Sequence, residues 1–90
     1  MPTQFLSPDE WSAVISRLGA SPRQRQLIEL VCNGMTERQI AEELGISQHT
    51  IHEYVARLYH KIGVTDRPQL VLRLFETYVQ MLHRVDSRAE

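Results

Sequence analysis

Residues 34–64 read GMTERQIAEELGISQHTIHEYVARLYHKIGV, and this stretch decides the fold. Thr36, with Gln39 three residues later, supplies the side-chain oxygens that cap the start of a helix. Gly45 ends that helix, because glycine adopts positive φ without a steric clash, and Ser47 caps the next one. The stretch therefore predicts two helices joined by a three-residue turn.

The second of these helices, over 47–62, has two chemically different faces. At about 100° per residue, its apolar side chains fall within roughly 40° of one line and must pack inward. They are Ile51, Val55, Leu58 and Ile62. The opposite face is polar and carries Gln48, His49, Thr50, His52, Glu53, Tyr54, Arg57, Tyr59, His60 and Lys61. Any function of this helix is expected on the polar face.

Similar capping signals divide the rest of the chain into helices. Ser7-Pro8-Asp9-Glu10 begins one that ends at Gly19, and Ser21-Pro22-Arg23-Gln24 begins another that ends at Asn33-Gly34. A last helix is predicted from about Asp66 to Val85. No β pattern is present. The fold class is therefore all-α, a small helical bundle of five helices.

Length and composition bound the function. The chain of 90 residues suits one domain, has 42% hydrophobic residues, and has no apolar run that approaches the roughly 20 residues of a membrane span. We expect a soluble, cytoplasmic protein with no membrane contact, because no secretory signal begins the chain. The one cysteine, Cys32, is expected to be a small core residue.

Charge is distributed unevenly. The net charge at pH 7 is −1, but residues 47–67 are locally positive and hold three of the four histidines. Phosphate binding favours such a basic segment.

The order of motifs also carries information. Four groups follow one another without gaps: Ser21, Arg23, Leu27, Ile28; then Gly34, Thr36, Ile40, Ala41, Leu44; then Ile46, Ser47, Thr50, Ile51; then Lys61, Ile62, Gly63, Val64, Arg67. In these groups residues 21–71 resemble the LuxR-type helix-turn-helix family, also called the FixJ or GerE type. The departures fall on polar positions. His52 stands where the family commonly has a lysine that reaches DNA, Tyr54 where it has a histidine, and Gln24 and Gln26 where it has acidic residues.

This resemblance implies a non-enzymatic, sequence-specific transcription regulator that binds double-stranded DNA and needs no cofactor. The helix over about 47–62 would enter the major groove. Base edges would be contacted by Gln48, His49, His52, Glu53 and Arg57. Phosphates would be contacted by Thr50, Tyr54, Lys61 and Arg67. Because histidine ordinarily titrates near 6.5, binding is expected to tighten between about pH 8 and 6.

The last helix has an apolar band too wide for one neighbour to bury. The helix within residues 1–20, an extension outside the family block, is one cover, with Trp11 on its apolar face. A second chain is the other possible cover of the last helix, since the resemblance to the family implies a homodimer through this helix. The expected interface is Leu74, Phe75, Tyr78, Met81 and Leu82. Residues 21–85 would form the DNA-binding domain and 86–90 a disordered tail.

Other functions were weighed on the same residues. His49 and His52, three apart, with Glu53 beside them could bind a metal, but no third convergent ligand is evident, so no metal site is predicted. No phosphate cradle or nucleophile constellation indicates catalysis. The alternative function is a degenerate helix-turn-helix that holds a partner protein without binding DNA, through Glu37, Glu42 and Glu43 or the last helix. No sensor domain is evident, so control could come from a separate regulatory protein.

Overall fold

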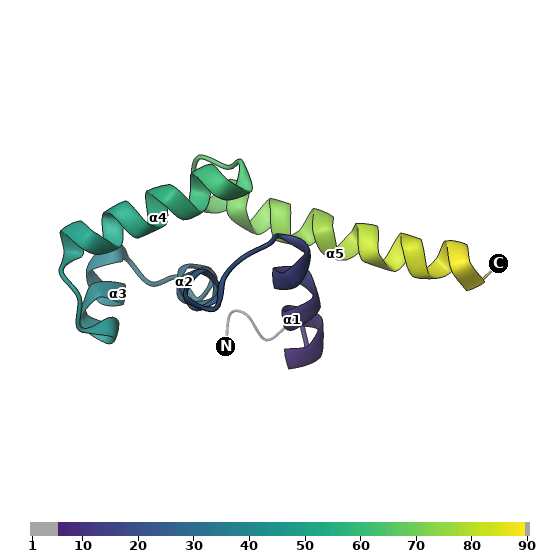
Figure 1. Cartoon of the computed structure of the whole chain (residues 1–90), viewed down its shortest axis with the longest axis horizontal. Helices are drawn as coiled ribbons and strands as arrows, with labels where there is room; N and C mark the ends of the chain where they lie inside the picture. Colours follow the sequence, from purple (N-terminus) through teal and green to yellow (C-terminus); the bar gives the residue numbers. More distant parts are fainter. Residues whose placement is uncertain (1–5, 90) are drawn as a thin grey trace.

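The computed structural model describes residues 6–89, and side chains are described up to residue 83. This part of the chain forms five α-helices and no strand, which confirms the all-α prediction. The helices are α1 (Pro8–Arg17), α2 (Pro22–Cys32), α3 (Glu37–Leu44), α4 (Gln48–Ile62) and α5 (Arg67–Ala89). The molecule is elongated, about 50 × 25 × 21 Å, because α5 extends away from the other helices toward the C-terminus (Figure 1).

Each of the first four helices begins where its capping signal predicts. The side chains of Ser7, Ser21 and Thr36 accept hydrogen bonds from backbone N–H groups three residues later, at 3.1–3.2 Å. The side chain of the third residue returns a bond to the cap in all three cases. Ser47 caps α4 by accepting from the Thr50 N–H at 3.1 Å. These helix starts are therefore local properties of the sequence.

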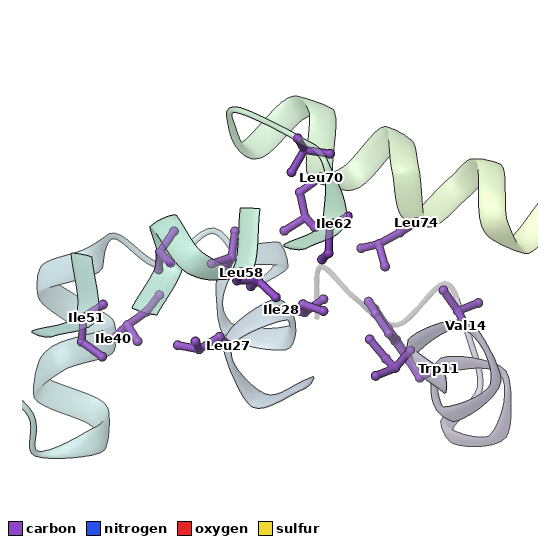
Figure 2. Packing of buried hydrophobic residues seen from close by; sticks show 14 of the residues in the cluster. Trp11, Val14, Leu27, Ile28, Ile40, Ile51, Leu58, Ile62, Leu70 and Leu74 are labelled. Atoms are coloured by element: carbon purple, nitrogen blue, oxygen red, sulfur yellow. The ribbon is translucent and has the colours of Figure 1, made fainter. Parts of the chain in front are cut away.

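Buried apolar side chains form one continuous row that joins all five helices (Figure 2). At one end Ile40 of α3 meets Ile51 of α4, and at the other Trp11 of α1 lies near Leu74 of α5. Between them lie the fully buried side chains of α2 and the second half of α4, including Leu27, Ile28 and Leu58. The apolar face predicted for α4 is confirmed, since all four of its residues are buried.

Helices α3 and α4 pack against each other more extensively than any other pair. In the turn between them Gly45 has φ 68°, a left-handed conformation that L side chains rarely adopt. The Ile46 N–H donates to the Ala41 carbonyl at 3.0 Å, and the Ile46 side chain packs against the core. The turn fixes the direction in which α4 leaves α3.

The N-terminal helix covers part of the last one. Trp11, Val14 and Ile15 of α1 are buried, and α1 contacts α5 directly. Tyr78 of α5 donates a hydrogen bond from its hydroxyl to Glu10 of α1 at 2.9 Å. The intramolecular cover predicted for α5 is therefore present.

The end of α5 differs from the prediction. The helix continues to Ala89, past the end expected at about Val85. No glycine or proline occurs in residues 85–90 to end a helix, and alanine and arginine favour its continuation. Residue 90 itself lies outside the described part. Among the described helices none is both long and apolar enough to span a membrane.

Candidate nucleic-acid interface

Helix α4 presents its polar face to solvent because the apolar face anchors it to the core. The side chain of His49 is 82% exposed and that of His52 is 69% exposed. Gln48, Glu53 and Arg57 are also exposed. The five residues predicted to contact base edges therefore lie on an uncovered surface of one helix. That surface is the candidate interface.

Two carboxylates face the histidines of this surface. Glu37, the first residue of α3, places Oε1 3.0 Å from His52 Nδ1. Glu53, one turn along α4, places Oε2 3.5 Å from His49 Nε2. His52 makes its contact through Nδ1, whereas His49 makes its contact through Nε2. The closer of the two contacts orients His52, because 3.0 Å is a hydrogen-bond distance.

One flank of α4 gathers cations, and we call Arg23, Arg57 and Lys61 the basic flank. The Arg23 guanidinium lies over the Tyr54 ring, 5.4 Å from its centroid, which is a cation–π contact. Arg23, Tyr54 and Arg57 line one shallow hollow of about 190 Å³. Lys61 Nζ donates to Gln24 Oε1 at 3.0 Å, close to the same hollow. The flank therefore combines cations from α2 and α4.

The other flank of α4 carries the groove that we call the histidine groove, with a volume of about 420 Å³. His52 and His60 line it together with Glu37 and Tyr59. Burial raises the pKa of the Tyr59 hydroxyl above its usual value, so it remains a neutral donor near neutral pH. The two flanks thus differ in charge.

Several residues predicted to contact phosphate already have contacts within the chain. Arg67 Nη2 donates to the Met35 carbonyl at 2.7 Å, which ties the start of α5 to the loop before α3. The Thr50 hydroxyl accepts from Ser47 Oγ at 2.9 Å. Arg67 is nevertheless exposed, and its guanidinium has further N–H donors. A phosphate contact would add to these bonds and would not replace them.

The metal alternative has no geometric basis in the part of the chain described. No group of three histidine, cysteine, aspartate or glutamate side chains there could hold an ion. His49 and His52 instead face different carboxylates, Glu53 and Glu37.

The residues expected at a dimer interface divide between two environments. Phe75 and Leu82 are 55% and 46% exposed, and Val71 and Leu72 beside them are exposed as well. Leu74 is only 2% exposed, because it belongs to the chain's own core. Tyr78 and Met81 are partly buried against that core. The apolar surface left open on α5 therefore excludes Leu74.

The fold and the exposed α4 surface define a small helix-turn-helix domain. The family model for bacterial regulatory proteins of the luxR family matches residues 20–74. The match covers more than half of the chain, which belongs to this family.

The chain is also similar to several bacterial transcriptional regulators. The chain is 41% identical over 54 residues to the transcriptional regulatory protein UhpA of Escherichia coli, covering 60% of this chain and 28% of that protein. It is 40% identical over 53 residues to the transcriptional regulatory protein FixJ of Azorhizobium caulinodans, covering 59% of this chain and 25% of that protein. It is 34% identical over 56 residues to the probable HTH-type transcriptional regulator GfsR of Streptomyces halstedii, covering 62% of this chain and 23% of that protein. The chain thus spans about a quarter of the length of these relatives. No solved structure matches it.

Two residues of the interface were missed by the sequence reasoning. Arg23 was matched to the family without a role, yet it completes the basic flank beside Tyr54. Glu37 was read as part of an acidic protein-binding surface, yet its carboxylate contacts His52. Both contacts join residues on different helices, so no local spacing pattern indicates them.

Proposed function

We propose that this chain is the DNA-binding part of a transcription regulator, with α4 as the helix that enters the major groove. The observation that carries the proposal is the exposure of Gln48, His49, His52, Glu53 and Arg57 on α4 in a chain of the luxR family. The named relatives are transcriptional regulators. The alternative function, a protein-binding module, is an outcome of the test below.

In this proposal the base contacts come from α4 alone, whereas the phosphate contacts also come from α2 and α5. Base edges are read by Gln48, His49, His52, Glu53 and Arg57. Phosphates are contacted by Thr50, Tyr54, Lys61 and Arg67, to which we add Arg23. The net charge of the chain is −1 and does not attract phosphates. The basic flank supplies that attraction, because phosphates respond to the charge close to them.

The test is retention on duplex DNA across a range of salt concentrations. Lys61→Ala should weaken binding and make its salt dependence shallower, because a phosphate contact releases counterions, and Arg57→Ala should weaken binding and relax the preference at one base position. Arg17→Ala is the matched control, since Arg17 is exposed in the last turn of α1, far along the chain from α4. Arg17→Ala should leave the affinity for DNA and its salt dependence unchanged. If no duplex binds at about 50 mM salt, the protein-binding module replaces this proposal.

We propose further that the chain acts as a homodimer through the exposed side of α5. Leu72, Phe75, Val79 and Leu82 follow the 3-4-3 spacing of a seam between two helices. A two-fold dimer would present two α4 helices to major grooves about 34 Å apart. Leu74 has no part in this seam because the core buries it.

Sedimentation tests the dimer. Phe75→Glu places a charge in the seam and should shift the chain toward monomer. Gln26→Glu adds the same charge at an exposed residue of α2, outside the seam, and should not. Equal behaviour of both variants, or a monomeric parent chain at tens of micromolar, would contradict the seam.

A further inference from the structure

The contact between His52 and Glu37 constrains where the histidine carries its proton. His52 Nδ1 lies 3.0 Å from Glu37 Oε1, and an ionised carboxylate can only accept hydrogen bonds. Nδ1 therefore has to be the donor. In a neutral imidazole one nitrogen is protonated and the other is not, so Nε2 is left as an acceptor.

Glu37 is well placed to impose this state. It is the first residue of α3, directly after the cap Thr36, where the helix dipole favours a negative charge. The backbone of α3 is fixed against α4 by the buried side chains of Ile40 and Ala41. Its carboxylate is also less exposed than the imidazole, 34% against 69%. The carboxylate is thus held while the far side of the ring stays open to solvent.

On the basis of the proposed function, we infer that Glu37 is a positioning residue that presets the base preference of His52. With Nδ1 bonded to Glu37, neutral His52 offers Nε2 to the major groove as an acceptor. Cytosine N4 and adenine N6 are the amino donors in that groove, whereas guanine O6 and N7 and thymine O4 are acceptors. His52 should therefore select cytosine or adenine at one position of each half-site.

The first experiment uses the DNA-free protein, so that it does not depend on the proposed function. Nitrogen-15 spectra of the imidazole rings at about pH 8 should show His52 with a protonated Nδ1 and an unprotonated Nε2. Glu37→Gln should abolish this fixed state, because an amide can either donate to Nδ1 or accept from it. Glu42→Gln removes an equal charge from α3 and should leave the His52 signals unchanged. A His52 that is protonated on Nε2 alone in the parent protein would overturn the inference.

The second experiment selects duplexes from a random library at about pH 8. The parent chain should prefer cytosine or adenine at one half-site position. Glu37→Gln should reduce the preference at that position by roughly tenfold, the worth of about one hydrogen bond, while other positions keep theirs. Glu42→Gln should keep the parent's preference. It also controls for any uniform gain in affinity from lost negative charge.

The outcomes separate the two proposals. If the tautomer is fixed but no duplex binds, Glu37 still positions His52, and base reading is withdrawn along with the proposed function. If duplexes bind and Glu37→Gln keeps the parent's preference at every position, Glu37 does not set the base preference of His52, while DNA binding stands.

Discussion

The hydroxyl of Tyr78 donates a hydrogen bond to Glu10 Oε2 at 2.9 Å and so joins two residues 68 positions apart in the chain. The other carboxylate oxygen of Glu10 accepts from the Ser7 backbone N–H at 2.8 Å. One side chain thus caps α1 and attaches it to α5. The N-terminal helix is thereby fixed to a helix on which the proposed dimer depends.

This link can be measured with a double-mutant cycle. Tyr78→Phe and Glu10→Ala should each lower the free energy of unfolding, and Glu10→Ala should lower it more because it also removes a bond of the α1 cap. The double variant should lose less than the sum of the two single variants, since both remove the same hydrogen bond. Urea unfolding of the four proteins provides the comparison, and strict additivity would show that the bond contributes nothing.

Glu10 also predicts a dependence of stability on pH. The Ser7 backbone N–H, followed by the Tyr78 hydroxyl, holds the pKa of the Glu10 carboxyl below its usual 4.5. A lowered folded-state pKa contributes stability above the unfolded value, and that contribution is lost as pH falls through the folded pKa. The stability difference between the parent and Glu10→Gln should therefore be present at about pH 6 and shrink below about pH 4. A difference that grows in acid would contradict the assignment.

Core burial in α4 predicts a large loss of stability. Leu58 is 0% exposed, and its replacement by alanine should cost about 2–5 kcal/mol in urea unfolding. Arg57→Ala is the control, because that residue is exposed on the same helix and its change should stay within about 0.5 kcal/mol. Similar losses for the two variants would mean that Leu58 does not anchor α4.

The left-handed backbone of the turn between α3 and α4 should cost free energy for any residue other than glycine, and a substitution can measure this cost. Gly45 has φ 68°, and a Cβ added there would meet nothing within 4 Å. Gly45→Ala should therefore cost about 1–2 kcal/mol from the left-handed conformation alone. Gly45→Asn should cost less, because asparagine tolerates this region better. Circular dichroism during thermal unfolding gives both values, and an alanine variant as stable as the parent would refute the strain.

Cys32 should react slowly while the chain is folded. Burial raises the pKa of its thiol from 9.0 to about 11. Since the thiolate is the reactive form, modification by a disulfide reagent at about pH 8 should be roughly 100-fold slower in the folded chain than in urea. The absorbance of the released thiolate reports both rates. Equal rates would indicate an exposed, ordinary thiol.

The sequence predicted this fold well where the information is local. Ser7, Ser21, Thr36 and Ser47 cap helices as their spacing indicates, and the apolar spacing in α4 identifies the buried face. The end of α5 was placed too early, because a helix without glycine or proline has no local stop signal.

The candidate site was less predictable because its contacts join distant residues. Lys61 bonds Gln24 on α2, 37 positions away, and Arg67 bonds the Met35 carbonyl, 32 positions away. The exposed surface of α4 could be derived from helical geometry alone. The partners of its side chains follow from packing, which no spacing rule encodes.

The division of α4 into an anchored side and an open side has a consequence for how such proteins diversify. Four buried residues anchor the helix and Ser47 caps its start, and none of these five is among the side chains predicted to contact DNA. Substitutions at Gln48, His49 or Glu53 can therefore accumulate with little penalty to folding. A scaffold of this kind can acquire new target preferences, in evolution or in the laboratory, by exchanging a handful of side chains.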